Sequence, residues 1–378
     1  MKVKSIAVIG AGFIGTVHIE AIRRMGFQVK GILTGSTESA SLAKQKLKIE
    51  HAYASVKEIC EDRDVSVVHV TSPNALHFEQ VSALIKAGKH VVCEKPLAVS
   101  TAEGEELLAL AQKHDIKHAL CFNTRFYPLV HEARIRILHG DIGEIKYINA
   151  HYHQDWLLLA SDWNWRLDPA LGGGLRAVAD IGSHLIDNLS FVTGLEVAEV
   201  FSDLHTFVKV RKKPMGSVET FSSSHGGDTV DVSMTTDDAA GILVRYTNGA
   251  RATLSISQVS GGQKNSLQWE IAGSKASFAF DAMSPEILWI GHRGQPNETL
   301  QKESSLLSPE ARRTAFYPAG HIEGFGETFR SLFEAFYDDL ENDTSSGAYP
   351  DFADGITSLK VTSAIAESTR TNNWVSAN

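Results

Sequence analysis

Short apolar runs alternate with amphipathic segments through the first third of the chain. Ser5–Ile9 is apolar and rich in β-branched residues, which is typical of a strand buried on both faces. Strands that alternate with helices predict an α/β domain with a doubly wound parallel sheet. Further strands are predicted at Phe27–Leu33, Val65–Val70, His90–Cys93 and Lys117–Phe122, and helices at Thr16–Met25, Ala75–Ala87 and Thr101–His114.

Beyond about residue 124 the pattern changes to successive strands separated by tight turns, which indicates an antiparallel sheet. Asn248-Gly249 is a strong hairpin signal between two of these strands. We therefore expect a domain boundary near residue 124, with a parallel-sheet domain at 1–124 and a second domain with an antiparallel sheet at 125–378. The polar residues 293–313 are expected to form a mobile excursion. Strands are predicted at Glu144–His153, Val197–Leu204, Thr229–Thr235, Ala240–Tyr246, Ala250–Val259, Leu267–Ala272 and Ser277–Phe280, and helices at Asp180–Thr193, Gly324–Leu340 and Phe352–Thr371, the last being a candidate to pack back on the first domain.

Charge and cysteine content exclude several classes of partner. The net charge of −9 argues against nucleic acid and against an anionic membrane surface, because both require a basic face. Cys60, Cys93 and Cys121 are odd in number and show no C-x-x-C spacing, so we expect reduced thiols and a cytoplasmic protein. The apolar run Ile6–Ile9 is too short for the core of a signal peptide.

Gly10-Ala11-Gly12-Phe13-Ile14-Gly15 matches G-x-G-x-x-G between a predicted strand and a predicted helix. The first glycine of such a turn permits its tight bend, and the second lets the backbone approach a pyrophosphate. The third lets helix and strand pack closely, and the helix N-terminus offers N–H groups to the anion. The turn therefore predicts a bound nicotinamide dinucleotide.

The end of the second strand bears on the choice between NAD and NADP. A ribose-binding acid is expected about 20 residues after the glycine turn, but this sequence has Thr34-Gly35-Ser36 there. No arginine or lysine follows at once to hold a 2′-phosphate. The residues leave both cofactors open, and we favour NAD slightly.

Glu94-Lys95-Pro96 follows a predicted strand. Ligands of doubly wound sheets bind at the carboxyl ends of strands, where a lysine can hydrogen-bond the reacting oxygen and share in proton transfer. Pro96 restricts Lys95 to extended backbone, which favours a fixed side chain. An ordinary surface lysine is the alternative that the local pattern leaves open.

Asp180 and His184 lie four residues apart on a predicted helix and therefore on one face. Histidine can take a proton near neutral pH, and a nearby carboxylate stabilises its charged form. The alternative is a solvated helix face with an ordinary ion pair. A metal site would have to join these two residues to His151 and His153, but no ligand motif supports one, and we expect no metal.

Polar and indole side chains gather in Asp162-Trp163-Asn164-Trp165-Arg166. Indole faces suit the C–H faces of a sugar ring, and polar side chains suit its hydroxyls. Arg125, after the last parallel strand, and His321 are further candidates for substrate contact. A packing role for one of the two tryptophans and for His321 is the alternative.

In combination these motifs resemble the glucose–fructose oxidoreductase, inositol dehydrogenase and rhizopine-catabolism (Gfo/Idh/MocA) family. The resemblance covers nearly the whole chain and rests on motifs in the family's order. It implies a Rossmann domain followed by an α/β domain whose large, mostly antiparallel sheet commonly builds homodimers or homotetramers. The matching pieces are Gly10–Gly15, Ser72-Pro73-Asn74 with His77, Glu94-Lys95-Pro96, and Gly172-Gly173-Gly174 leading into Asp180-Ile181-Gly182-Ser183-His184.

The resemblance also implies residue roles. His184 would be the general base on the substrate hydroxyl, Lys95 would orient that oxygen, and Asp180 would bind a neighbouring hydroxyl. Cofactor contacts are expected at Gly10, Gly12, Phe13, Ile14, Gly15, Thr34, Gly35, Ser36, Ser72, Pro73, Asn74, His77, Glu94, Lys95, Pro96, Trp165 and Arg166, and substrate contacts at Lys95, Arg125, Asp162, Trp163, Asp180, His184 and His321.

The expected activity is an NAD(P)-dependent oxidation or reduction of a sugar, glycoside or cyclic polyol, with C3 of a glucoside as the specific expectation. A non-catalytic dinucleotide-binding regulator is the alternative, although a regulator would not need Lys95, Asp180 and His184 together. A metal-dependent hydrolase or lyase is a third hypothesis, which the dinucleotide turn argues against.

Overall fold

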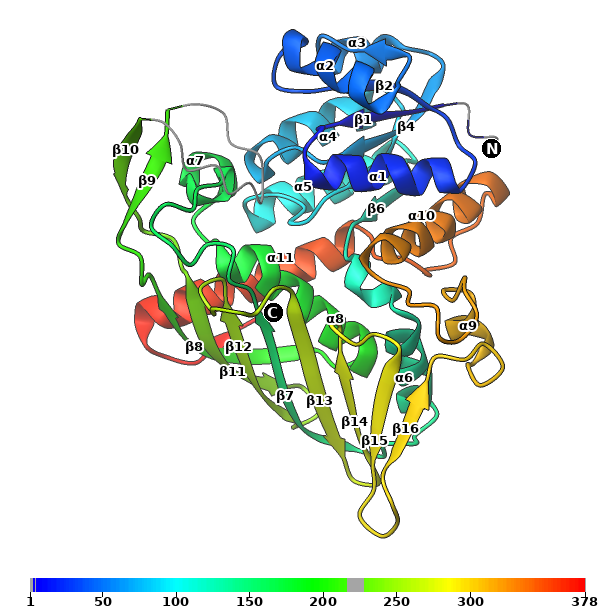
Figure 1. Cartoon of the computed structure of the whole chain (residues 1–378), viewed down its shortest axis with the longest axis vertical. Helices are drawn as coiled ribbons and strands as arrows, with labels where there is room; N and C mark the ends of the chain where they lie inside the picture. Colours follow the sequence, from blue (N-terminus) through cyan, green and yellow to red (C-terminus); the bar gives the residue numbers. More distant parts are fainter. Residues whose placement is uncertain (1–2, 4, 216–227, 378) are drawn as a thin grey trace. The chain divides into compact units, whose positions relative to one another are not determined.

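The structure is a computed structural model that describes residues 3, 5–215 and 228–377. Contacts within the chain define two compact units (Figure 1). Among the described residues, no helix has the length and apolar character that crossing a membrane demands. Unit 1 comprises Met1–Asn123, Ala170–Gly173 and Phe329–Leu359, and unit 2 comprises Thr124–Pro169, Gly174–Thr328 and Lys360–Asn378.

Unit 1 is built on a six-stranded parallel sheet in the order β3-β2-β1-β4-β5-β6. The order reverses between β1 and β4, and this switch point is where dinucleotides bind in such sheets. The strands are buried, as their continuous apolar runs predict, and the predicted doubly wound sheet is confirmed. The bounds are β1 Ser5–Ile9, β2 Val29–Leu33, β3 His51–Ala52, β4 Val65–Val70, β5 His90–Cys93 and β6 His118–Leu120.

Helices surround this sheet, and three of them begin at a serine that caps the helix. The hydroxyls of Ser36, Ser55 and Ser100 each accept a backbone N–H three residues further on, which satisfies one of the donors left open at a helix start. The helices are α1 Phe13–Arg24, α2 Thr37–Leu47, α3 Val56–Glu61, α4 His77–Lys86, α5 Thr101–Lys113 and the short α7 Pro169–Gly172, together with most of α10 Phe325–Asn342 and the first part of α11 Phe352–Thr371.

Unit 2 is built on a nine-stranded sheet in the order β16-β15-β14-β13-β7-β12-β11-β8-β17. Only β7 and β12 pair in parallel within it, so the prediction of a large, mostly antiparallel sheet is confirmed. The bounds are β7 Ile145–His153, β8 Val197–His205, β11 Ala239–Tyr246, β12 Arg251–Ser257, β13 Ser266–Gly273, β14 Ser277–Asp281, β15 Ile287–Gly291, β16 Glu298–Gln301 and β17 Val375–Ser376, with a separate pair β9 Val210–Pro214 and β10 Thr229–Ser233.

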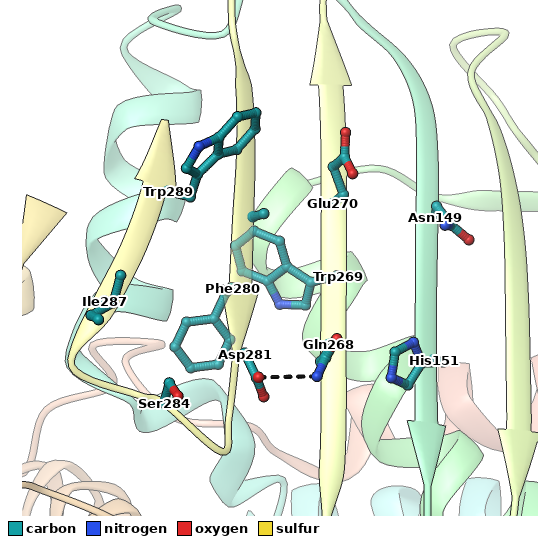
Figure 2. A pocket seen from close by; sticks show the side chains of 11 residues that line it. Asn149, His151, Gln268, Trp269, Glu270, Phe280, Asp281, Ser284, Ile287 and Trp289 are labelled. Carbon is teal, nitrogen blue, oxygen red and sulfur yellow. Dashed lines mark hydrogen bonds between the residues drawn. The ribbon is translucent and has the colours of Figure 1, made fainter. Parts of the chain in front are cut away.

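One face of this sheet is buried and the other is open. On β7, Ile148, Ala150 and Tyr152 belong to the core, which also includes residues of α6 Pro128–Leu138 and α8 Ser183–Thr193. The intervening side chains point to the open face. A hollow of about 340 Å³ lies on this face. In it the Gln268 amide donates to Asp281 Oδ2 over 3.0 Å, and Figure 2 shows the side chains around this contact. The hollow is lined by Asn149, His151, Gln268, Trp269, Glu270, Ala279, Phe280, Asp281, Ser284, Ile287 and Trp289.

The prediction of a mobile excursion at residues 293–313 is wrong. Glu298–Gln301 forms β16 at the edge of the sheet and pairs with β15. Pro309–Arg312 forms the short helix α9, and the N–H of Ser308 before it donates to Glu132 Oε2 over 2.8 Å. These segments are polar because an edge strand and a surface helix face water, so their composition resembles that of a loop.

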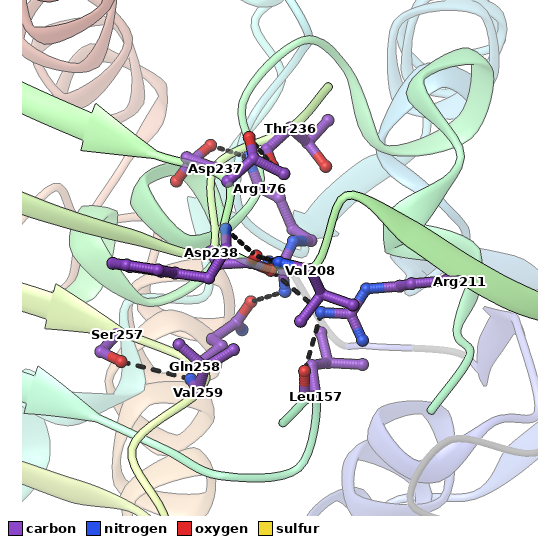
Figure 3. Close-up of polar contacts among 12 residues, drawn as sticks. Leu157, Arg176, Val208, Arg211, Thr236, Asp237, Asp238, Ser257, Gln258 and Val259 are labelled. Carbon is purple, nitrogen blue, oxygen red and sulfur yellow. Dashed lines mark hydrogen bonds and ion pairs between the residues drawn. The ribbon is translucent and has the colours of Figure 1, made fainter. Parts of the chain in front are cut away.

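A buried ionic cluster fixes the region where β11 begins (Figure 3). Asp238 accepts hydrogen bonds from Arg176 Nη2 and from Arg211 Nη2, and all three side chains are at most 1% exposed. The other Asp238 oxygen accepts the backbone N–H groups of Phe207 and Val208 over 2.7 and 2.8 Å. One carboxylate therefore satisfies four donors inside unit 2.

Removing this carboxylate should destabilise the protein far more than removing an exposed one. Asp238→Ala leaves two guanidinium groups buried without their anion, which costs about 3 kcal/mol or more. Glu199→Ala, which breaks the half-exposed pair with Arg245, should cost less than about 1 kcal/mol. Urea denaturation followed by circular dichroism measures both, and equal losses of unfolding free energy would contradict the assigned role of Asp238.

Candidate active site

The glycine turn lies at the switch point of unit 1 and is closely packed at two of its three glycines. A Cβ on Gly10, which has φ +108°, would lie 2.4 Å from Thr71 Oγ1 at the end of β4. A Cβ on Gly15 would lie 2.2 Å from the Gly10 carbonyl oxygen. Nothing lies within 4 Å of a Cβ on Gly12, which immediately precedes α1. Close packing explains why Gly10 and Gly15 are glycines. Gly12 is explained by the space that a ligand needs at the start of the helix.

Hydroxyl groups occupy the end of β2, where many dinucleotide sites have an acid. Ser36 caps α2, and its hydroxyl accepts the Ser39 N–H over 3.1 Å. The Thr34 hydroxyl lies 3.0 Å from the Ser36 carbonyl oxygen, to which it donates. Gly35, between them, has nothing within 4 Å of an added Cβ. The loop therefore presents neutral polar groups.

His77 joins the loops after β4 and β5. Its Nε2 lies 2.9 Å from the Ser72 carbonyl oxygen and its Nδ1 lies 2.8 Å from the Pro96 carbonyl oxygen. Both partners are carbonyl oxygens that can only accept, so a protonated ring would donate to both. Burial opposes protonation, because it lowers the pKa of His77. Pro73 precedes a 3-10 turn in which Asn74 donates to the Gly172 carbonyl oxygen over 2.9 Å. The two loops that carry the family motifs of unit 1 are thus tied together.

Lys95 follows a glutamate that is held by a chain of buried side chains. Glu94 Oε1 lies 3.1 Å from His18 Nε2, and Glu94 Oε2 accepts the Lys95 N–H over 3.2 Å. His18 Nδ1 lies 2.9 Å from His69 Nδ1, and His69 Nε2 lies 2.8 Å from the Tyr337 hydroxyl. The Lys95–Pro96 peptide bond is cis.

The direction of these hydrogen bonds follows from the first one. With a neutral His18 ring, Nε2–H donates to the Glu94 carboxylate and Nδ1 accepts from His69 Nδ1–H, so that His69 Nε2 accepts from the Tyr337 hydroxyl. This order needs a neutral His69 and a protonated Tyr337. Burial favours both, because it lowers the pKa of His69 and raises that of Tyr337. The chain therefore fixes Glu94 and, through it, the Lys95 backbone.

The described residues hold one group with the spacing of metal ligands, His18, Glu94 and Cys121, whose ligand atoms lie within 4.8 Å. Burial raises the pKa of the Cys121 thiol, and a protonated thiol is a poor ligand. His151 and His153 lie on the open face of the unit 2 sheet, near Ser266 and Ser255 hydroxyls. They form no such group with Asp180 and His184 in the part of the chain that the structure describes.

Asp180 lies in a π-helical turn, Val178–Gly182, that leads into α8. The prediction of a regular α-helix from Asp180 is therefore wrong for its first turn. Asp237 explains the difference, because its carboxylate accepts the N–H groups of Arg176 and Val178 over 2.6 and 2.8 Å and holds the start of the segment. Such π-turns are frequently found at functional sites.

The side chains of this segment are enclosed. His184 is 8% exposed and Asp187 is 5% exposed, so a solvated helix face is excluded. Asp180 Oδ1 accepts from Arg166 Nε over 3.0 Å, and its Oδ2 accepts from the Gln258 amide over 2.8 Å. Both oxygens of the predicted catalytic aspartate are thus engaged by donors.

The remaining predicted residues of unit 2 divide into those near this segment and those elsewhere. Arg125 is buried, and its Nε donates to Asp187 Oδ2 over 2.8 Å on the helix that carries His184. The Trp165 ring lies under the Arg166 guanidinium, 4.4 Å from it. Asp162, Trp163 and His321 lie in loops. The Asp162 carboxylate accepts the Leu159 N–H, and the Trp163 ring faces the Lys213 ammonium group. The His321 carbonyl oxygen accepts a hydrogen bond from Lys302.

Several site residues were not predicted from the sequence. Gln258, Arg176, Asp237 and Asp238 form the surroundings of Asp180, and His18 and His69 hold Glu94. The signal that could have found the acids is Asp237-Asp238 immediately before an apolar strand, since two such acids at a buried strand end need cationic or N–H partners.

Two family descriptions match the chain. Residues 4–120 match the oxidoreductase family with an NAD-binding Rossmann fold, and residues 130–279 match the GFO/IDH/MocA C-terminal domain.

Relatives match over nearly their whole length. Levoglucosan dehydrogenase of Pseudarthrobacter phenanthrenivorans is 28% identical over 99% of this chain and 98% of its own. Glucose-6-phosphate 3-dehydrogenase of Bacillus subtilis is 23% identical over 95% and 94%. A solved levoglucosan dehydrogenase in complex with NADH and levoglucosan has a TM-score of 0.88 and 27% identity over 98% of each chain. This chain therefore belongs to the Gfo/Idh/MocA family of NAD-binding oxidoreductases.

Proposed function

We propose that this protein transfers a hydride between NAD and a secondary alcohol of a sugar, glycoside or cyclic polyol, with C3 of a glucoside as the specific candidate. The observation that carries the proposal is the enclosed segment on which Asp180, with both oxygens engaged by donors, and His184 lie four residues apart. The names of the full-length relatives support a sugar substrate, and one of them names oxidation at C3.

The residues present fit a dinucleotide. Gly12 leaves open space at the start of α1, and Gly10 and Gly15 bring the turn close to β4 and to itself. When bound, the nicotinamide supplies the acceptor or donor of the hydride. NAD is favoured because the loop Thr34–Ser36 offers hydroxyl groups and no cation for a 2′-phosphate, and because the similar levoglucosan dehydrogenase was solved with NADH.

In this proposal three side chains handle the substrate hydroxyl. His184 takes its proton as general base, which suits an imidazole near neutral pH. Lys95 donates a hydrogen bond to the same oxygen and stabilises the negative charge that develops there. Asp180 accepts a hydrogen bond from a neighbouring hydroxyl and so sets which carbon reacts. The bound sugar stacks on the indole rings of the Asp162–Arg166 segment.

The proposal includes a homo-oligomer built on the open face of the unit 2 sheet. Tyr147, Leu243 and Ile287 lie on that face, and each is 44–46% exposed. Exposed apolar side chains that share one sheet face are typical of surfaces that bind another chain.

The activity should appear as formation of reduced nicotinamide. Incubation with NAD and levoglucosan, glucosides, glucose 6-phosphate or inositols should raise the absorbance of the reduced ring for one sugar class, and NADP should react more slowly. Product analysis by mass spectrometry should locate the carbonyl at C3. No turnover by protein that binds NADH would favour the regulator instead.

Substitutions at different glycines of the turn should affect NADH binding and thermal stability separately. Gly12→Ala should leave the thermal midpoint unchanged but weaken NADH binding about tenfold or more, because the methyl group takes space meant for the pyrophosphate. Gly15→Ala should lower the midpoint, because its Cβ meets the Gly10 carbonyl. Gly294→Ala, equally open in unit 2, is the control and should change neither. Unchanged NADH affinity in Gly12→Ala, measured by calorimetry, would contradict the cofactor site.

Loss of either proton-handling side chain should abolish most of the turnover. Lys95→Ala and His184→Ala should each lower kcat by roughly a hundredfold or more, as loss of an acid–base group does, with the NADH dissociation constant unchanged. His139→Ala, at an exposed position after α6, is the control. Near-normal kcat in both site variants would refute the assigned roles.

A further inference from the structure

The carboxylate of Asp180 lies between a charged and a neutral donor. Arg166 Nε binds Oδ1 over 3.0 Å, and Gln258 Nε2 binds Oδ2 over 2.8 Å. Arg166 is a permanent cation, whereas an amide can present either its NH₂ group or its oxygen to a neighbour. The second contact therefore depends on what holds the Gln258 amide in one orientation.

Arg176 decides that orientation. Its Nη1 lies 3.0 Å from Gln258 Oε1, and a guanidinium can only donate. Gln258 Oε1 must then accept, so the NH₂ group must face Asp180. Gln258 is fully buried, its backbone N–H donates to the Asp238 carbonyl oxygen over 3.0 Å, and both ends of its amide are engaged, by Arg176 and by Asp180.

Arg176 is fixed in turn by the buried cluster shown in Figure 3. Its Nη2 binds the Asp238 carboxylate, which also binds Arg211, and its backbone N–H donates to Asp237. Arg176 thus donates to Asp238 on one side and to Gln258 on the other, and Gln258 in turn donates to Asp180. All of these residues lie in unit 2.

The NH₂ group that Gln258 presents to Asp180 favours the ionised form of this aspartate. An N–H group directed at Oδ2 stabilises the carboxylate and opposes a proton on that oxygen. Ionisable groups that interact with Asp180 also include Arg166, Arg176 and Tyr152, and His184 follows it on α8. The two arginines act in the same direction as Gln258, while burial keeps the Tyr152 hydroxyl protonated by raising its pKa.

We propose that Gln258, oriented by Arg176, is a positioning residue that keeps Asp180 ionised and directed at the substrate. The inference rests on the proposed function, in which Asp180 accepts a hydrogen bond from a sugar hydroxyl. It extends that function by naming a residue outside the family motifs that sets the low-pH limit of activity.

Gln258→Glu is the most informative variant, because it keeps the shape of the side chain. It places a second carboxyl beside Asp180 while Arg176 remains its partner, so the two acids compete for ionisation. We expect kcat at pH 7 to fall about tenfold and the acidic limb of the kcat/KM profile to move up by about one pH unit, as for interacting carboxyls. KM for NAD should stay unchanged.

The chain offers a matched control. Gln268 on β13 also donates its amide to an aspartate, Asp281 Oδ2 over 3.0 Å, but on the open face of the sheet. Gln268→Glu introduces the same charge beside an aspartate and, with the oligomeric state verified by size-exclusion chromatography, should leave kcat and the pH profile as in the wild type. Gln258→Met removes the donor without adding charge, and it should lower kcat with a smaller shift of the profile.

A readout that needs no turnover separates this inference from the proposed function. The Asp180 carboxyl can be titrated by carbon NMR of aspartate-labelled protein, with Asp180→Asn identifying its signal. Gln258→Glu should raise the pKa of Asp180, and Gln268→Glu should not. An unchanged Asp180 titration in both Gln258 variants would overturn the inference even if the enzyme is active. Absence of wild-type turnover with every sugar would instead overturn the proposed function.

Discussion

The structure around Asp180 depends on burying the Asp238 carboxylate. A buried carboxylate is costly unless cations and N–H groups satisfy it, and here two arginines and two backbone N–H groups do so. Satisfying it fixes Arg176, and Arg176 fixes the amide of Gln258. The neighbouring Asp237 holds the backbone that enters the π-turn. The position of Asp180 is therefore a consequence of charges that are themselves buried.

The same principle operates in unit 1, where two histidine rings and a tyrosine hydroxyl lead to one buried carboxylate. Tyr337, His69 and His18 form a chain whose direction is set by the Glu94 carboxylate, and Glu94 holds the backbone of Lys95. Low dielectric strengthens such buried hydrogen bonds and makes a broken one expensive. In both units the side chain proposed to touch substrate is positioned by partners of fixed polarity. This arrangement suits an enzyme that must hold reacting groups in one geometry.

Local patterns predicted most strands of the sheets, because buried strands are apolar runs and half-buried strands alternate, but β3, β9, β15 and β17 were not predicted. β1, β4 and β5 have the bounds that were predicted, and the glycine turn lies at the switch point where its spacing indicated. The π-turn at Asp180 and the edge strand β16 were missed. The π-turn depends on Asp237, which is far from Asp180 in the sequence. The strand β16 faces water, so its composition resembles that of a loop.

The motif residues of the candidate site were likewise predictable, whereas their supports were not. Lys95, Asp180 and His184 occur in short motifs, but Gln258 contacts Arg176 at a separation of 82 residues. His69 and Tyr337 are separated by 268 residues. Such contacts arise from the tertiary fold and leave no local periodicity in a single sequence.

The most direct test of the central claim follows a labelled hydrogen. A sugar that the enzyme oxidises, deuterated at every ring carbon that bears a hydroxyl, would be incubated with the enzyme and NAD, and the reduced cofactor analysed by mass spectrometry. Hydride transfer predicts one deuterium in the nicotinamide ring for each sugar oxidised. Sugar converted to product while the reduced cofactor carries no deuterium would contradict the account.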